Sequence, residues 1–483
     1  MEQKRRNIMR SLMTVLTEDE VIRIHEATLH VLESTGVRVD SDKAIKILVQ
    51  HGAKADGTRV RMPKAMVEEA IRKVQKEVIL AARDPKYSLT LPTKNFTYNA
   101  TSGYSPFVKD METGETRNST AADLKDYAVL CDYLDLVAFF WPIAMPTEEK
   151  SPILEELCAL DVSLRNTRKH IQCSCAWGTA AEYQIQLAAV VAGGEEALRK
   201  NPIFSAVASP NTPLIFEKDV VEAMIILAEA GVPVVPMNVP LAGTTAPVTL
   251  AGAITLTNAE QIATLVILKC ANPDAPMVYS SDTGIADLRN GQVNYEAPEY
   301  PLLAAACAQM ARYYGLPSCV AHGSSEVRPF ELSYGFERNV LKIVMSQMTR
   351  TDLSAWIGSL DNAINSSLWD VVLDVEALEQ ALAYLRMFEV NDDTLALDAI
   401  AEAGPGGHFL AHRHTIKHFR KELWVRKLED TFIFDAADDL PFPEKAKEKV
   451  REILSSHQVP MIDEDKQKEM DKIMEMARRK ISK

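Results

Sequence analysis

Short apolar runs alternate with amphipathic stretches of helix length from residue 96 onward. Runs of this length that are bounded by turn residues are typical of strands buried on both faces. Eight such runs lie at 96–101, 136–145, 170–176, 203–208, 232–237, 277–281, 318–321 and 353–357. The stretches with helical periodicity lie between them at 121–133, 153–164, 181–191, 220–230, 259–270, 302–314 and 336–348. This alternation predicts an α/β fold, a closed (β/α)₈ TIM barrel over residues 96–400.

A doubly wound open sheet is the alternative interpretation of the same alternation. Nucleotide-binding proteins of that class carry a GxGxxG turn after the first strand or a Walker lysine loop. No GxGxxG follows the first strand here, and no Walker loop occurs in the sequence. The barrel is therefore the favoured prediction.

The residues on either side of the predicted barrel show helical patterns. Thr17 followed by Glu20 is a capping box, and Pro63 is placed as a first-turn proline. We therefore expect residues 1–95 to form a mainly helical region packed on the barrel. Residues 401–483 are expected to form a C-terminal helical extension, whose charged tail at 463–483 covers the barrel or contacts another subunit.

The segment 231–253, GVPVVPMNVPLAGTTAPVTLAGA, combines a β-branched run with a turn of small residues. It predicts a buried strand, a turn and a packed helix. Side chains around the turn at 241–247 are small, so backbone can approach a ligand or partner closely there. The alternative is an ordinary strand-to-helix connection in which glycine and proline only end the elements. We expect the turn to lie at the mouth of the barrel.

Composition narrows the class of protein. The chain has 483 residues and a formal net charge of −14, which argues against an unaided nucleic-acid or acidic-membrane surface. Its seven cysteines include no CxxC pair, which is typical of reduced thiols in a cytoplasmic enzyme, and Cys173 and Cys175 are expected to be buried small hydrophobes. Neither a secretory signal nor a membrane span is evident in the sequence.

Aromatic residues follow several of the predicted strands. Because the working face of a barrel lies at the carboxyl ends of its strands, Tyr104, Trp141, Trp177 and Trp356 are candidate substrate-binding residues. Ring faces attract a methylated ammonium by roughly 0.5 to 2 kcal/mol per contact. The alternative is that the tryptophans only fill the barrel.

Titratable residues at the same strand ends are few. His322 and Glu326 are the candidate catalytic residues, and Asp282 and Arg328 are candidate substrate-binding residues. Lyase or hydrolase chemistry with His322 and Asp282 is the alternative enzyme class that this set allows.

Four histidines, His408, His412, His414 and His418, fall close together after the barrel region. On a helix they would make two pairs at i and i+4. No glutamate accompanies them as in HExxH, and Arg413 and Lys417 flank two of them, so helix capping or contact with an anion is favoured over metal. We expect no metal site.

Three motifs together resemble a known family. They are FVKDMETGETRNSTAADL at 107–124, LAGTTAPVTLAG at 241–252 and GGHFLAHRHTIKHFRKELW at 406–424. They are similar to the trimethylamine methyltransferase superfamily, over about residues 20–435, and specifically to its members without pyrrolysine. The resemblance implies a TIM barrel that moves a methyl group from an amine to the Co(I) of a separate corrinoid protein.

Two features of the sequence bear on what the resemblance implies. No DxHxxG cobalamin-binding signature occurs, so the resemblance implies a corrinoid that a partner protein supplies and no tightly bound cofactor. The chain contains ordinary residues in the segment 321–328, near which pyrrolysine falls in the archetype. Family members of this kind act on quaternary amines, which leave as neutral amines. The implied substrates are glycine betaine, proline betaine and carnitine-type betaines.

Strand-end position then assigns roles within that reaction. Tyr104, Trp141, Trp177 and Trp356 are expected to form an aromatic cage for the ammonium. Arg328 or His322 anchors the substrate carboxylate and Glu326 or Asp282 balances the ammonium charge. The turn residues Gly243, Thr244 and Thr245 are expected where the corrinoid approaches. A homo-oligomer is expected, and the alternative to catalysis is a relative that only binds methylamines or betaines.

Overall fold

The computed structural model describes residues 12–295, 297–320, 332–424 and 442–481, with backbone alone for 332–339 and 442. Within these residues, strands and helices alternate as the sequence predicts. The parallel strands are β6 (Tyr98–Thr101), β9 (Val137–Phe139), β10 (Ile171–Ser174), β11 (Phe204–Val207), β13 (Val234–Val235), β15 (Tyr279–Ser280), β17 (Ser318–Cys319) and β18 (Leu353–Ile357). The α/β prediction is confirmed, and each predicted apolar run contains one of these strands.

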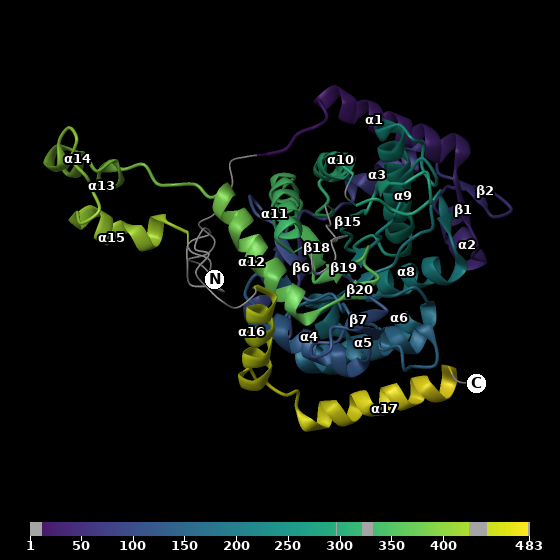
Figure 1. Cartoon of the computed structure of the whole chain (residues 1–483). Helices are drawn as coiled ribbons and strands as arrows, with labels where there is room; N and C mark the ends of the chain where they lie inside the picture. The colour runs from purple at the N-terminus through teal and green to yellow at the C-terminus, as the bar shows by residue number, and fades with distance from the viewer. Residues whose placement is uncertain (1–11, 296, 321–331, 425–441, 482–483) are drawn as a thin grey trace.

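The helices that follow these strands form the outer layer (Figure 1). They are α4 (Ala121–Tyr133), α5 (Pro152–Asn166), α6 (Gly178–Ala192), α8 (Lys218–Ala230), α9 (Leu250–Ala271), α10 (Glu299–Tyr314), α11 (Leu332–Met348) and α12 (Leu368–Leu385). Each helix packs against the next one in this series. Helix α16 (Phe442–Ser456) packs against both α12 and α4, the last and the first of them.

The parallel strands pair with one another in chain order around a ring. One sheet has the order β15-β17-β18-β6-β9 and another the order β10-β11-β13, with parallel pairs throughout. Single parallel bridges join the two sheets, Phe140 with Ile171 and Val234 with Met277. Each of the eight strand segments therefore has a neighbour on both sides.

The space inside the strands is filled by a cluster of apolar side chains. The strands and the residues beside them contribute Ala100, Phe139, Trp141, Val207, Val235, Met237, Val278, Cys319, Leu353 and Ala355. The hairpin of β4 (Val78–Leu80) and β5 (Leu89–Leu91) adds four buried side chains to the same cluster. Ala81 O accepts a hydrogen bond from Nδ1 of His170, which precedes β10, at 2.7 Å. The hairpin thus closes the amino-terminal end of the strands.

The N-terminal region packs on the outside of α9. It contains α1 (Glu18–His30), α2 (Asp42–Gln50) and α3 (Lys64–Arg72), all of which contact α9. Strands β1 (Val37–Val39), β2 (Lys54–Asp56) and β3 (Arg59–Arg61) make a small sheet with β12 (Ile215–Phe216). The predicted capping box of Thr17 and Glu20 starts α1. Helix α9 is long and apolar enough to cross a membrane, but it is mostly buried here, as in the core of a soluble protein.

Further strands lie beyond the carboxyl ends of the parallel strands. β7 (Phe107–Lys109) and β8 (Thr116–Asn118), which follow β6, join β19 (Ser359–Leu360) and β20 (Asn365–Ser366), which follow β18. β14 (Leu241–Ala242), after β13, pairs with β16 (Gly284–Ile285), after β15. The turn at 241–247 is therefore on the carboxyl-end side, as the sequence predicts.

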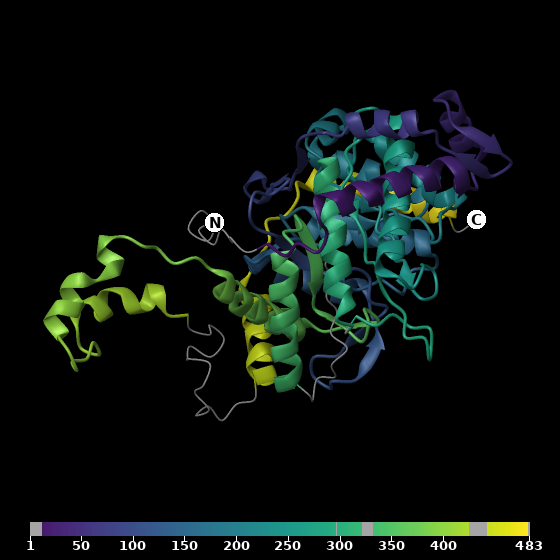
Figure 2. The same ribbon diagram turned by 90° about the horizontal axis from the view of Figure 1, so that it is seen from above.

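The chain after α12 contains α13 (Asp392–Leu395), α14 (Leu397–Ala403), α15 (Arg413–Glu422) and α17 (Glu464–Ile481), besides α16. Helix α17 packs on α5 and α6. Residues 387–424, which include α13 to α15, stand away from the rest of the protein in both views (Figures 1 and 2). We call this stretch the arm.

Candidate active site

Trp141 follows the end of β9 and lies in the apolar cluster inside the ring of strands. Its backbone is fixed by Thr101, whose Oγ1 accepts from Trp141 N at 3.0 Å and donates to Trp141 O at 2.6 Å. Its indole lies against Gly103, where a Cβ atom would stand 2.3 Å from Cε2 of Trp141. The buried indole N–H has no hydrogen-bond partner among the described residues. Buried donors are normally paired, so this N–H suits a ligand acceptor.

Tyr104 follows β6 and packs against both the inner cluster that contains Trp141 and the outer cluster beneath the helices. Its backbone N donates to Pro142 O at 3.0 Å, and its φ of 38° is in the left-handed region, which a tyrosine rarely adopts. The hydroxyl shares a hydrogen bond with Sγ of Cys173 at 3.3 Å. Burial raises the pKa of Tyr104 well above its usual value, so the phenol is neutral. Both predicted residues, Tyr104 and Trp141, therefore contact the inner cluster of apolar side chains.

Glu156 of α5 reaches the same region and was missed by the sequence reasoning. Its two carboxyl oxygens accept from Ala176 N, just after β10, at 3.1 and 3.2 Å. Burial raises the pKa of Glu156 to about 8. At neutral pH its carboxyl group is therefore mostly protonated. The sequence signal is an acidic residue on the apolar face that Ile153 and Leu160 define at helical spacing.

A second acidic residue supports the end of β13. Nδ2 of Asn238 donates to Oε2 of Glu260, whose Oε1 accepts from Leu214 N at 2.8 Å. Gln261 donates to Oδ1 of Asn238 at 3.1 Å. Burial raises the pKa of Glu260 to about 7. This network fixes the backbone just before the 241–247 turn.

Asp282 follows β15 as predicted, and two tyrosines that the sequence reasoning did not select hold it. Tyr295 donates to Oδ2 at 2.6 Å and Tyr300 donates to Oδ1 at 2.5 Å. The two rings are 5.4 Å apart and nearly perpendicular. A carboxylate flanked by two aromatic rings is an environment that attracts a cation.

The remaining predicted site residues are two tryptophans and three residues that the structure does not describe. Trp177 is the N-cap residue of α6 and packs against the outer, helix-facing cluster. Trp356 also belongs to that outer cluster, and its indole N–H donates to Oδ1 of Asn99 at 3.2 Å. These two tryptophans therefore contact the outer cluster, whereas Trp141 belongs to the inner one. The predicted residues His322, Glu326 and Arg328 lie outside the described residues.

The predicted partner-approach residues form a tight turn. Thr244 N donates to Leu241 O at 3.1 Å, and Leu241 N donates to Oγ1 of Thr245 at 2.9 Å. Gly243 has a φ of 101°, and a Cβ there would stand 2.8 Å from Cδ2 of Leu288. Glycine is therefore required at this position. Thr244 is exposed, as are the apolar side chains of Val248 and Leu288.

Comparison with known proteins identifies the chain. The trimethylamine methyltransferase (MTTB) family model matches residues 1–482. The chain belongs to this family. The resemblance predicted from the three motifs is thereby confirmed, and the protein is a methyltransferase.

Relatives in the family are similar over nearly their whole length. The glycine betaine methyltransferase of Desulfitobacterium hafniense (strain Y51) is 28% identical, over 93% of this chain and 94% of the relative. The trimethylamine methyltransferase MttB of D. hafniense (strain DSM 10664 / DCB-2) is 30% identical, over 91% and 89%. Among solved structures, the monomethylamine methyltransferase (MtmB) of Methanosarcina barkeri aligns over 100% of this chain and 97% of its own at 11% identity, with a TM-score of 0.48.

The histidines of the third family motif do not form a metal site in the structure. His408 precedes α15, so only His414 and His418 form the predicted i and i+4 pair, with ring centroids 4.4 Å apart. His412 instead contacts Glu402 at 3.1 Å. In the part of the chain that the structure describes, no group of three or more His, Cys, Asp or Glu residues is arranged to hold a metal ion.

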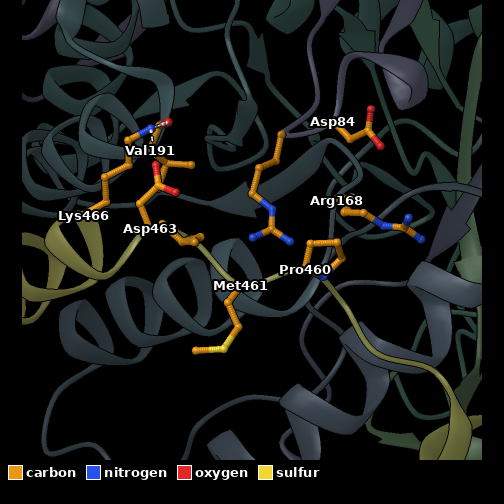
Figure 3. Close-up of a pocket in the computed structure, with 9 residues that line it drawn as sticks. Asp84, Arg168, Val191, Pro460, Met461, Asp463 and Lys466 are labelled. Carbon is orange, nitrogen blue, oxygen red and sulfur yellow. Dashed lines mark hydrogen bonds and ion pairs between the residues drawn. The ribbon is translucent and has the colours of Figure 1, made fainter.

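A cavity of about 290 Å³ lies at the opposite, amino-terminal end of the strands (Figure 3). Its lining comprises Arg83, Asp84, Arg168, Val191, Pro460, Met461, Ile462, Asp463 and Lys466. Arg168 is bound to Asp132 at 2.6 Å, and Lys466 lies 3.9 Å from Asp463, so these charges pair within the protein. Because Arg168 precedes β10, this cavity is separate from the carboxyl-end site.

Proposed function

We propose that the chain is a betaine:corrinoid-protein methyltransferase. Its substrate is a quaternary amine that bears a carboxylate: glycine betaine, proline betaine or a carnitine-type betaine. The observation that carries this is the family match together with Trp141, Tyr104 and Asp282, which all follow the carboxyl ends of parallel strands. The ring of eight parallel strand segments is proposed to be a closed (β/α)₈ barrel, whose working face is at those ends.

Betaine chemistry fits the charges of this site. The rings of Trp141 and Tyr104 offer faces to the trimethylammonium, and Asp282 with its tyrosines balances the positive charge. The buried indole N–H of Trp141 offers a hydrogen-bond donor to the substrate carboxylate. Arg328 and His322, which the sequence predicts as carboxylate anchors, are proposed as further donors. Trp356 has its N–H engaged by Asn99, so the proposal assigns the cage to Trp141 and Tyr104.

Methyl transfer from a quaternary ammonium needs no general base. The carbon–nitrogen bond breaks with its electron pair going to nitrogen, and the product is a neutral tertiary amine. The corrinoid of the partner protein supplies the Co(I) nucleophile that accepts the methyl group. The residues of this chain exclude water from the ammonium, orient one methyl group outward and hold the rest of the substrate still.

The partner enters from the side of the 241–247 turn. Gly243 and Thr244 are exposed there, and Val248 and Leu288 add apolar surface with exposed fractions of 67% and 68%. Small residues allow the partner backbone and the corrinoid to come close. The protein is proposed to work in the cytoplasm, with the corrinoid protein as its macromolecular partner, without nucleic acid or membrane.

The decisive experiment mixes the purified protein with a reduced corrinoid protein and single betaines. Formation of methyl-Co(III) is followed by its visible absorbance, and transfer is expected from at least one betaine and not from trimethylamine. If no quaternary amine methylates a corrinoid protein that a known methyltransferase does methylate, the proposal is wrong. Calorimetric binding of a betaine without any transfer would instead identify a binding relative.

A further inference from the structure

The cavity at the amino-terminal end of the strands joins parts of the chain that are far apart in the sequence (Figure 3). One part of its lining is Arg83 and Asp84, from the turn between β4 and β5, with Arg168, which precedes β10. The other part includes residues 460–463, which join α16 to α17, and Lys466 of α17. Its volume of about 290 Å³ is at the lower end of the range for ligand pockets, so it suits a small molecule.

The backbone on both sides of Arg83 is fixed. Ala82 N donates to Oγ of Ser88 at 3.1 Å, which closes the turn between β4 and β5. Asp84 N donates to Arg168 O at 3.1 Å, which ties the turn to the chain before β10. The side chain of Arg83 therefore starts from a fixed point on the lining of the cavity.

The guanidinium group of Arg83 carries a donor that the protein does not use. Its Nη2 is buried and has no hydrogen-bond partner among the described residues. Burial lowers the pKa of Arg83, although the nearby carboxylates of Asp132 and Asp84 oppose the shift. A guanidinium group still keeps its charge at neutral pH. Because a charged donor removed from water is costly unless it is paired, Arg83 suits a bound acceptor with a negative charge.

The other charged groups of the lining have partners in the protein or lie in water. Arg168 donates to Oδ2 of Asp132 through Nε at 2.9 Å and Nη2 at 2.6 Å. Nζ of Lys466 donates to Val191 O at 3.0 Å. The side chain of Asp463 is 83% exposed, so water solvates its charge. Among the described lining residues, Arg83 is therefore the cation that a ligand would neutralise.

We propose that this cavity binds a small organic monocarboxylate, with the carboxylate on the guanidinium group of Arg83 and a short apolar chain in the rest of the cavity. The planar fork of a guanidinium group matches the two oxygens of a carboxylate. Asp84 and Asp463 also line the cavity, and they disfavour a second negative charge on the ligand. A monocarboxylate therefore fits better than a doubly charged phosphate.

The apolar part of the lining selects a ligand with a short alkyl chain. It consists of Val191, Pro460, Met461 and Ile462. Val191 and Ile462 are each only 8% exposed, whereas Met461 is 81% exposed, so the cavity opens to solvent beside Met461. Affinity is expected to rise by up to about fourfold for each CH₂ group that enters the cavity.

Isothermal titration calorimetry of the full chain with sodium butyrate tests the proposal. Chloride keeps the ionic strength constant, and the pH is one at which inorganic phosphate is a dianion. Affinity is expected to increase from acetate through propionate to butyrate. Inorganic phosphate and butylamine are each expected to bind at least 10-fold more weakly than butyrate. The thermal unfolding temperature should rise with butyrate concentration, because the ligand binds the folded state.

Four variants locate the bound butyrate. We expect Arg83→Gln to bind it at least 10-fold more weakly. The matched control is Arg72→Gln, an exposed arginine of α3 that pairs with Glu69 at 2.6 Å, and it should bind like the wild type. Met461→Glu adds a negative charge beside the opening and should weaken binding at least 3-fold. Trp141→Phe should bind butyrate like the wild type, because Trp141 lies at the carboxyl ends of the strands. Circular dichroism checks that each variant folds.

Several results would overturn the proposal. They are no saturable butyrate binding to the wild type, wild-type affinity in Arg83→Gln or in Met461→Glu, weaker binding in Trp141→Phe, and tighter binding of phosphate than of butyrate. If Arg83→Gln does not fold, Met461→Glu and Trp141→Phe decide between the two ends of the strands. Hydrogen exchange gives a further measurement, since bound butyrate should slow exchange in residues 457–463. Unchanged exchange there at saturating butyrate would contradict the proposed location.

Discussion

Trp141 and Gly103 are in contact across two neighbouring strands, and the contact leaves no room for a side chain at position 103. A Cβ atom there would stand 2.3 Å from Cε2 and 2.6 Å from Nε1 of Trp141. The backbone of Trp141 is held by Thr101, so the indole would have to move. The position of the candidate cage thus depends on a glycine two residues after a strand-end threonine.

We expect Gly103→Ala to displace the indole and lower kcat/KM for the betaine at least 10-fold. Overpacking of this kind costs about 1 to 3 kcal/mol of stability. The matched control is Gly178→Ala, whose Cβ would meet Cδ1 of Ile226 at 3.3 Å and should leave activity unchanged. Steady-state kinetics with thermal unfolding separates the two effects. An active Gly103→Ala enzyme would show that the indole position is unimportant.

Trp141 and Trp356 are expected to respond differently to the same substitution. Trp141→Phe removes the unpartnered indole N–H and the larger ring face, so the betaine Kd should rise roughly 2- to 30-fold. Trp356→Phe removes a hydrogen bond between β18 and Asn99 of the neighbouring β6, and should lower the unfolding temperature while leaving the Kd unchanged. Isothermal calorimetry measures both. Equal increases in Kd for the two variants would show that Trp356 also contributes to betaine binding.

Asp282 is expected to act through its charge. Asp282→Asn leaves one oxygen that accepts a tyrosine hydroxyl and an NH₂ group that cannot accept the other. We expect a higher KM for betaine with a smaller change in kcat, because the lost charge stabilises the bound ammonium. Tyr295→Phe is the matched variant, since it keeps the charge and loses one hydrogen bond. If Asp282→Asn and Tyr295→Phe raise KM equally, the hydrogen bond from the Tyr295 hydroxyl, and not the charge of Asp282, accounts for the change in KM.

The buried carboxyl group of Glu156 is expected to make the free energy of unfolding depend on pH. Its folded pKa is raised to about 8, so the folded state binds more protons than the unfolded state between pH 4.5 and 8. The stability that the neutral carboxyl contributes is complete below pH 4.5 and is lost as pH rises toward 8. Relative to Glu156→Gln, the wild type should lose up to about 1.4 kcal/mol per pH unit across that window. Paired urea or thermal unfolding series check this, and parallel curves would contradict it.

Local patterns in the sequence were enough to locate the elements of the fold. Each apolar run from 96–101 to 353–357 contains a parallel strand, and the helix predicted at 121–133 is α4 with the same bounds. Strand and helix propensities act over a few residues, and burial on both faces selects β-branched and aromatic side chains. The positions of Tyr104, Trp141 and Asp282 just after β6, β9 and β15 could be predicted because the carboxyl end of a strand can be read locally.

Other residues near the strand ends are placed by contacts between distant parts of the chain. Glu156 and Glu260 lie inside helices and reach strand ends through Ala176 and Asn238, so the strand-end rule does not select them. Tyr295 and Tyr300 come from the segment before and at the start of α10 and converge on Asp282. Conversely, Trp177 and Trp356 satisfy the rule, yet they pack in the outer cluster and not in the inner one.

The sequence by itself determined the family, the alternation of strands and helices and the carboxyl-end position of the 241–247 turn. These follow from side-chain periodicity and from motifs that are continuous in the chain. Only the tertiary structure decided that the indole of Trp141 fits against Gly103, that buried carboxyl groups have raised pKa values, and that the third motif lies on the arm. Those properties depend on which distant residues remove a side chain from water or leave it exposed.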